Sequence, residues 1–537
     1  MSNRLPAGLA AIALLLAASA FAIGTRGVSA AEHEPLGPDR YAVVTQGYTS
    51  YEWWLTSWVT NKVACTLYVD HDGLPTGGDI LSECGVELYG SWMETESCSQ
   101  SESDPPSCQG YYLVSAGSEP AERQVGVMLP PPVVWVTLDG CVPYNSTFRC
   151  DTLPTLVLTG EEPLDGEHIT GLGGWIDGQP FVCDAVCQVD LAPTSLEGQW
   201  IEFWANSSYG DSSELFQARV RVAASDDPAD SGWYTDVLSS QWRGNPLAGC
   251  SQGWGTFPPV GGVPAWLAMP QRPEELATDI PYEYLAANLI VQGIADASSC
   301  ADGGLSGPGL VSPCGMEAAR QAVADWQNRF DDLIFLAARD VGVPAQLLKS
   351  IFSRESQFWP GVASGKPEAG LGQLTEGGAD TALLWNRPYF EQFCPTILDD
   401  AVCRRGYTQL QPAQQESLRA ALVRSVNAFC ADCPLGIDLE RADQSVTVFA
   451  ETLLASCSQT GMVLDLNYEG ADPPPTYEDL WRFTLVNYNA GPGCLGLAVD
   501  QTSSLGETLD WEHVSSHLTP ACRGALDYVT DIHGTSP

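Results

Sequence analysis

The chain has 537 residues, of which 44% are apolar, and it contains 17 Trp. This size and composition are typical of a folded protein with roughly three to four domains. The formal charge of −43 excludes nucleic acid as an expected partner, because the chain offers no basic surface to displace the counterions of a nucleic acid.

The first 30 residues predict a secretory signal. Arg4 precedes a nearly continuous apolar run over 9–23, and Val28-Ser29-Ala30 offers a cleavage site. No later stretch is long and apolar enough to span a membrane. We therefore expect a secreted protein, extracellular or in the cell envelope, with no membrane span in the mature chain. Whether the signal is cleaved or kept as an anchor is left open.

The 18 cysteines predict up to nine disulfides formed in an oxidising compartment. Cys430 and Cys433 have the spacing of a redox motif, but among so many cysteines a structural bridge is favoured. Short separations favour local pairing elsewhere: Cys65 with Cys84, Cys98 with Cys108, Cys141 with Cys150, Cys183 with Cys187 and Cys300 with Cys314.

Residues 31–128 and 129–225 each predict a β-rich module. Cys65 to Asp70 alternates as a half-buried strand does, and a turn follows it. Short, evenly spaced strands with turns between them favour a sandwich-like second module, in which most Trp side chains are interpreted as core. Its expected strands are 133–138, 156–159, 199–204 and 216–222.

Residues 226–315 are rich in Pro, Gly and Trp and predict a connector with one helix at 280–293. Over 316–537 the apolar period becomes helical. We therefore expect a multidomain chain, with β-rich, sandwich-like N-terminal modules followed by an α-helical domain. The helices expected there are 319–337, the one that carries Glu355, 376–386, 413–429, 443–456 and 477–486.

Glu355 continues the apolar stripe of its helix. Leu347, Leu348, Ile351 and Phe352 follow a helical period, and Glu355 comes four residues after Ile351. We expect the carboxyl to point inward, where burial raises its pKa. Such a carboxyl can act as a general acid near neutral pH, but proteins also bury an occasional paired Glu for structure. The stripe alone leaves both interpretations open.

Two motifs resemble those of the soluble lytic transglycosylase family, which shares the goose-lysozyme-like fold. The second family signature appears as the run Asn-Tyr-Asn-Ala-Gly-Pro-Gly at 487–493, and Tyr528-Val529 weakly echoes a C-terminal element. The resemblance covers about 316–533. The first motif has the family's order and spacing: Glu355-Ser356, Pro360, Ser364, Gly370-Leu371 and Gln373.

The resemblance implies an enzyme that cleaves the β-1,4 bond between N-acetylmuramic acid and N-acetylglucosamine in peptidoglycan. Glu355 would protonate the glycosidic oxygen and then act as base on the sugar's own 6-hydroxyl, giving a 1,6-anhydro product. Ser364 and Gln373 match positions that line the glycan cleft. Tyr488 matches the tyrosine beside the catalytic glutamate, and Asn489 follows it as a further substrate-binding residue. This chemistry implies no metal and no cofactor.

The chain departs from the family pattern around the first motif. Gly372 stands where the family has Met, and Trp359 stands where Asn precedes the proline. An insert of about fifty residues, 387–436, separates the two motifs. These departures concern the shape of the cleft and its sugar specificity.

Two alternatives to a transglycosylase remain open. Glu368 and Glu376 add carboxylates near the loop, and if either faces Glu355 and activates water, the enzyme is a lysozyme- or chitinase-like hydrolase. A non-catalytic cell-surface protein that binds glycans on the same scaffold is the other alternative.

No metal site is predicted. Asp70-His71-Asp72-Gly73 begins like a calcium loop, but Leu74 breaks the ligand pattern. His513 and His517 are spaced to share a helix face, but they lack the zinc-protease motif and are interpreted as surface residues.

Overall fold

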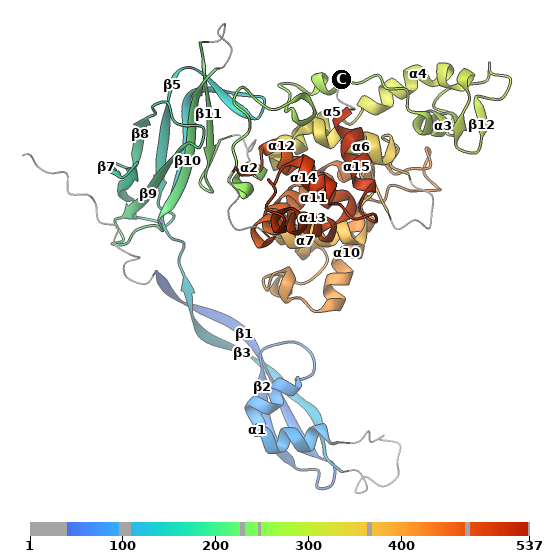
Figure 1. The fold of residues 1–537 in the computed structure, drawn as a ribbon. Coiled ribbons are helices and arrows are strands. Elements are labelled where there is room, and N and C mark those ends of the chain that lie inside the picture. Colours follow the sequence, from blue (N-terminus) through green and yellow to red (C-terminus); the bar gives the residue numbers. More distant parts are fainter. Residues whose placement is uncertain are drawn as a thin grey trace, which may run out of the picture.

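The structure is a computed structural model, and it describes residues 40–534 except 96–108, 226–230, 245–248, 362–367 and 468–472. A β-rich region over 41–238 precedes a helical region over 313–534, as predicted (Figure 1). The predicted signal, the expected pairing of Cys98 with Cys108, and Ser364 lie outside the described residues.

A long two-stranded ribbon extends away from the rest of the molecule (Figure 1). Its strands, β1 (Tyr41–Ser57) and β3 (Tyr111–Met128), are antiparallel. At the far end β2 (Val63–Val69) joins β1, and α1 (Gly77–Met93) packs on this three-stranded sheet. The helix α1 was not expected from the sequence. The small core at this end is formed by Leu55, Leu67, Val69 and Ile80.

The next eight strands form one antiparallel sheet in the order β4-β5-β11-β10-β9-β6-β7, with β8 paired to β5. All four segments predicted as strands lie within it, and in β10 the alternate residues Phe216, Ala218 and Val220 are buried, as the alternation predicts. The strands are β4 (Val133–Tyr144), β5 (Thr147–Glu161), β6 (Ile169–Ile176), β7 (Gln179–Cys183), β8 (Val186–Asp190), β9 (Gln199–Ser207), β10 (Phe216–Ala224) and β11 (Trp233–Leu238).

Arg40 fixes the base of the ribbon to this sheet. Its guanidinium is buried and forms ion pairs with Asp211 and with Glu162, the latter at 2.7 Å. It also donates to the Pro130 carbonyl oxygen at 2.7 Å. The two carboxylates raise the pKa of Arg40 further, so the cation stays charged and both buried anions are neutralised.

The segment expected as a connector packs into the core of the helical region. Trp266, Leu267 and Leu285 are buried in the same hydrophobic cluster as the later helices, and Cys250 is disulfide-bonded to Cys457, 207 residues away. The segment also contacts the sheet. Arg221 of β10 pairs with Asp236 of β11 and donates to the carbonyl oxygen of Pro258, which lies in the segment beyond the sheet. The segment begins with β11, which belongs to the sheet. The elements that follow β11 are α2 (Gly249–Trp254), α3 (Glu283–Val291), β12 (Leu305–Gly307) and β13 (Leu310–Val311).

The helical region surrounds a single large core. The predicted helix over 319–337 is wrong as one element. It divides at Phe330, whose buried side chain turns into the core while the next helix begins at Asp331. The helices are α4 (Pro313–Asn328), α5 (Asp331–Val341), α6 (Ala345–Ser356), α7 (Glu376–Trp385), α8 (Arg387–Phe393), α9 (Asp400–Cys403), α10 (Pro412–Val426), α11 (Leu439–Asn467), α12 (Tyr477–Ala490), α13 (Pro492–Ser504), α14 (Trp511–Ser516) and α15 (Gly524–Gly534).

Eight disulfides connect the described cysteines. Four of the predicted local pairs are confirmed, as is the bridge between Cys430 and Cys433. The remaining bridges join Cys250 to Cys457, Cys394 to Cys403 and Cys494 to Cys522. Across the described ranges, no helix combines the length and the apolar character needed to cross a membrane.

Candidate active site

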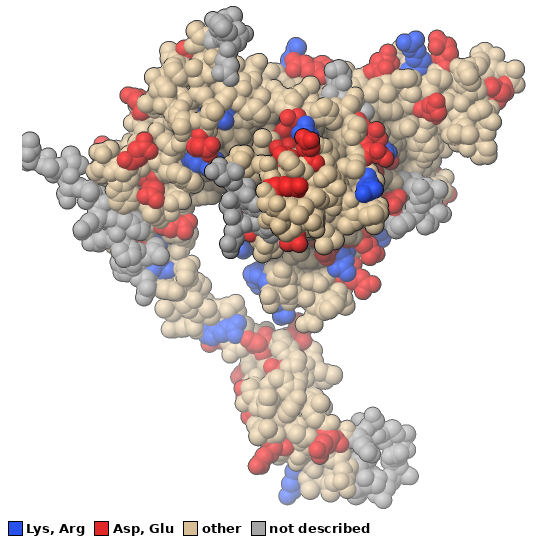
Figure 2. Space-filling view, viewed as in Figure 1, with Lys and Arg blue, Asp and Glu red and all other residues tan. Residues whose placement is uncertain are grey.

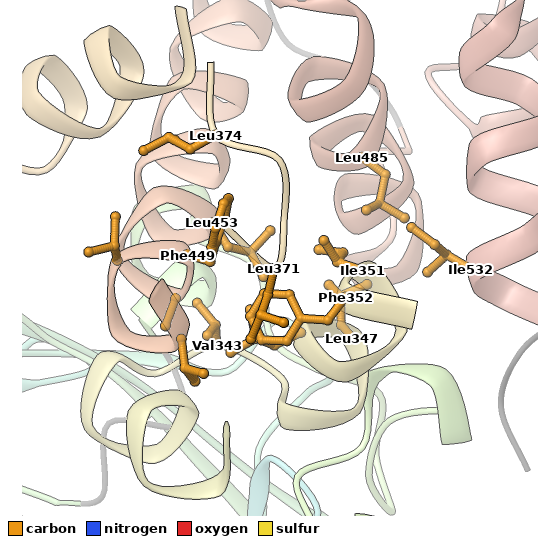
Figure 3. Close-up of a cluster of buried hydrophobic side chains, with 14 of the residues drawn as sticks. Val343, Leu347, Ile351, Phe352, Leu371, Leu374, Phe449, Leu453, Leu485 and Ile532 are labelled. Atoms are coloured by element: carbon orange, nitrogen blue, oxygen red, sulfur yellow. The ribbon is translucent and has the colours of Figure 1, made fainter. Parts of the chain in front are cut away.

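The helix α6 runs through the centre of the helical region, with Glu355 in its last turn. Leu347, Ile351 and Phe352 are fully buried, as the apolar stripe predicts. In Figure 3 they contact a cluster that includes Leu371, Phe449, Leu485 and Ile532, contributed by a loop and three other helices. This packing fixes the position and rotation of α6, and with it the direction of the Glu355 side chain.

Glu355 is half-buried and lines a cleft of about 480 Å³. Burial raises the pKa of its carboxyl above the ordinary value, and the negative charge of Glu368 raises it as well. The Tyr528 hydroxyl and the Arg354 guanidinium act in the opposite direction. A carboxyl with a raised pKa holds its proton at a higher pH, which a general acid requires.

Two stacked tyrosines lie beside this carboxyl. The rings of Tyr488 on α12 and Tyr528 on α15 are 6.5 Å apart and nearly parallel. The Tyr528 hydroxyl approaches Glu355 without completing a hydrogen bond of standard geometry. Burial and the charge of Glu355 raise the pKa of both phenols, so both hydroxyls stay protonated and remain available as donors.

A tight loop forms another part of the cleft wall. Ala369 and Leu374 exchange two backbone hydrogen bonds of 3.0 and 2.7 Å, and Gly370 makes the turn with a φ of 75°. Gln373 also has a positive φ, and its side-chain amide donates to the Gly370 carbonyl oxygen at 2.8 Å. Buried Leu371 and Leu374 hold the loop on the core (Figure 3).

The Tyr488 hydroxyl donates a hydrogen bond of 3.0 Å to the carbonyl oxygen of Gly372. It thereby links the second sequence motif to the loop of the first motif. Of the residues predicted for the site, Glu355, Gln373, Tyr488 and Asn489 all line the one cleft, although more than 110 positions separate the two groups. Asn489 is exposed at the cleft surface.

The two additional acidic residues near the loop take different positions. Glu368 lines the same cleft as Glu355 and acts on its pKa. Glu376 is the first residue of α7; it is exposed and is not among the residues that line the cleft. Of these two residues, only Glu368 therefore lies where it can influence Glu355 and a ligand in the cleft.

Two departures from the family pattern have a packing reason. A Cβ atom at Gly372 would lie 2.5 Å from a ring carbon of Phe449, so Phe449 fills the space that a side chain at 372 would need. Trp359 is buried against the Trp326 ring, with centroids 5.3 Å apart. At both positions the contact is made by an aromatic ring of another helix, Phe449 at Gly372 and Trp326 at Trp359.

Further residues line the cleft that the sequence patterns did not single out. Thr381 on α7 and the pair Thr452 and Ser456 on α11 contribute hydroxyl groups. Asn487 donates to the Ser456 carbonyl oxygen at 3.0 Å, while its own buried oxygen has no partner among the described residues. The four-residue spacing of Thr452 and Ser456 was the available signal, since it puts both on one helix face.

The described residues contain no group of three or more His, Cys, Asp or Glu side chains able to hold a metal ion. His513 pairs with Asp510 at 2.8 Å, and His517 pairs with Glu507 at 2.6 Å. In the N-terminal module, Asp70 pairs with Arg123 at 2.5 Å. Asp70, His513 and His517, three of the polar residues weighed as metal ligands in the sequence, therefore each have a charged partner in the protein.

Comparisons with models of protein families, with curated proteins and with solved structures found no significant match.

Proposed function

We propose that the chain is a peptidoglycan lytic transglycosylase on a lysozyme-like helical scaffold, with Glu355 as its single acid and base. The observation that carries this proposal is the convergence of both motifs on one cleft, which Glu355, Gln373 and Tyr488 all line, with Tyr488 close enough for the charge of Glu355 to raise its pKa. A glutamate that served only to stabilise the fold would not require a cleft lined by side-chain amides and hydroxyl groups. The eight disulfides support action outside the reducing cytosol.

In the proposed reaction the glycan strand lies in the cleft, with a glycosidic oxygen at the Glu355 carboxyl. The protonated carboxyl donates its proton to this oxygen as the bond to the anomeric carbon breaks. The resulting carboxylate then takes the proton of the 6-hydroxyl as that oxygen bonds to the anomeric carbon. The Tyr528 hydroxyl favours the carboxylate in this second step, because its dipole lowers the pKa of Glu355.

A hydrolase is the second candidate, and the position of Glu368 favours it. Two carboxyl groups across a cleft are the usual arrangement of glycosidases, in which one protonates the leaving oxygen and the other activates water or attacks carbon. Because Glu368 lines the same cleft as Glu355, it is the residue that would act on water. The sugar product would then have a reducing end.

Digestion of purified peptidoglycan followed by mass spectrometry of the products tests the proposal. We expect 1,6-anhydro ends from the wild type, and a loss of at least about 100-fold in rate from Glu355→Gln, because a positioned general acid contributes that much or more. Glu376→Gln, an exposed Glu outside the cleft, is the matched control. Reducing ends that disappear with Glu368→Gln would favour the hydrolase, and equal product from wild type and Glu355→Gln would leave only a binding role.

A further inference from the structure

A second cavity of the helical region lies away from Glu355. It encloses about 800 Å³ and is formed by the end of α7, by α8 and by the segment that follows α8. The disulfide between Cys394 and Cys403 closes that segment into a short loop, and Tyr407 packs edge-on against Phe390. Most of the wall therefore belongs to the insert over 387–436, which the family resemblance does not explain.

Basic residues gather at this cavity in an otherwise acidic chain. The insert holds five of the 24 Lys and Arg residues and five acidic residues, so it is neutral in a chain of charge −43. Figure 2 shows Lys and Arg side chains on the part of the surface formed by the insert, below α7 in Figure 1. Arg387, Arg404 and Arg405 line the cavity.

Two of these arginines lack a counterion within the protein. Arg387 pairs with Glu391 at 2.7 Å. Arg404 and Arg405 are exposed side chains that form no ion pair or hydrogen bond with the described residues. Asp400 is the other acidic residue of the cavity wall, so the unpaired charge there is positive. Neighbouring guanidinium groups are suited to oxyanions, which they bind through paired N–H donors.

The cavity and the Glu355 cleft share α7 as a wall, and some of their lining residues are neighbours on its surface. Gly377 and Thr381 line the cleft, and Leu384 lines the cavity. At 3.6 residues per turn these three positions fall within an arc of about 60°, and Thr381 and Leu384 are about 4.5 Å apart along the axis. This shared wall is the geometric basis for a single extended ligand that reaches both cavities.

We propose that the basic cavity binds an oxyanion, a carboxylate or a phosphate, carried by the same polymer whose sugar backbone occupies the Glu355 cleft. The insert would then make the enzyme selective for glycans with acidic substituents. This inference rests on the proposed function, because the polymer is taken from it. Both kinds of oxyanion occur as substituents on glycan polymers, and the test distinguishes them.

The test is a calorimetric titration of the full chain carrying Glu355→Gln, which prevents turnover. The probes are a soluble disaccharide-peptide with free peptide carboxylates, the same compound with those carboxylates amidated, and inorganic phosphate. We expect the free carboxylates to bind at least about fivefold tighter than the amidated ones, consistent with a partly exposed charge contact. Adding Arg404→Ala and Arg405→Ala should remove that difference and leave binding of the amidated compound unchanged.

The matched control carries Arg320→Ala and Arg424→Ala, which remove the same charge from exposed positions outside both cavities. It should keep the preference for carboxylates. Equal affinity for the two compounds, together with no phosphate binding that depends on Arg404 and Arg405, would overturn the inference. Equal loss in both double variants would also overturn it, because the effect would then come from net charge.

The outcomes separate the two proposals. Phosphate binding that depends on Arg404 and Arg405, without a preference for carboxylates, identifies phosphate as the oxyanion. Failure of both disaccharide compounds to bind contradicts the proposed substrate. In that case inorganic phosphate decides the question of the cavity alone: binding that the Arg404→Ala, Arg405→Ala variant loses supports an oxyanion site, and no binding overturns it.

Discussion

The ammonium group of Lys349 lies 2.7 Å from a carboxylate oxygen of Asp331, and both side chains are buried. The Leu276 carbonyl oxygen and the Asn328 side chain accept its other hydrogen bonds, at 2.6 and 2.8 Å. Burial lowers the pKa of Lys349 and raises that of Asp331, so each depends on the other to remain charged. Because Lys349 belongs to α6, this pair fixes the helix that carries Glu355 six residues later.

We predict that Lys349→Met destabilises the helical region by about 3–5 kcal/mol, because Asp331 is left as a buried charge without its partner. Urea unfolding followed by Trp fluorescence measures the loss. The double variant Lys349→Met, Asp331→Asn should recover a large part of it, since no buried charge remains. Equal loss in the single and double variants would show that packing around Lys349, rather than the ion pair, holds α6.

The pH profile of cleavage should depend on Glu368. In the proposed reaction cleavage needs protonated Glu355, so the rate should fall as pH rises through the pKa of that carboxyl. Burial and the charge of Glu368 raise this pKa, so Glu368→Gln should lower it and move the alkaline limb to lower pH. Glu376→Gln should leave the limb in place. An unchanged limb in Glu368→Gln would mean that the two carboxyl groups do not interact in the working enzyme.

Glu355→Gln should be more stable than the wild type at alkaline pH. A folded-state pKa above the unfolded value means that ionisation is disfavoured in the fold, so stability is lost as pH rises through the folded pKa. The glutamine variant has no such loss. Differential scanning calorimetry should give it the higher Tm at about pH 8, with the difference disappearing below about pH 4. A variant less stable at every pH would contradict the burial cost assigned to the carboxylate.

The disulfide between Cys250 and Cys457 should contribute far more stability than the one between Cys183 and Cys187. Their sequence separations are 207 and 4, and a longer closed loop restricts the unfolded chain more. Replacing both members of the long bridge by Ala should cost about 2–5 kcal/mol in denaturant unfolding of the helical region. The short bridge, replaced in the same way, is the control and should change the transition of the sheet only slightly.

Local patterns in the sequence predicted the features that depend on neighbouring residues. The period of Leu347, Ile351 and Phe352 predicted the direction of Glu355, and the alternation in 216–222 predicted the buried apolar face of a strand. The local disulfides followed from short spacing. In each case the residues that decide the structure lie within about twenty positions of each other.

Local sequence patterns could not predict the contacts between segments that are distant along the chain. Tyr528 approaches Glu355 from a helix more than 150 residues later, and nothing in the Tyr528 sequence context points to a carboxyl. Phe449 occupies the space above Gly372, so the reason for that glycine lies on another helix. The break at Phe330 was missed because the apolar period continues across it while the chain turns. Tertiary packing decides all three.

The bridge between Cys250 and Cys457 also constrains how the molecule is made. During synthesis six other cysteines, which form three short-range pairs, emerge between the two partners. Those pairs span 14, 9 and 3 positions and can close early, because short loops are quick to form. Cys250 must meanwhile stay reduced, or exchange a wrong partner, until α11 has been made. Correct oxidation therefore depends on thiol–disulfide exchange late in production, and a host that oxidises cysteines strictly in order of appearance will accumulate mispaired chains.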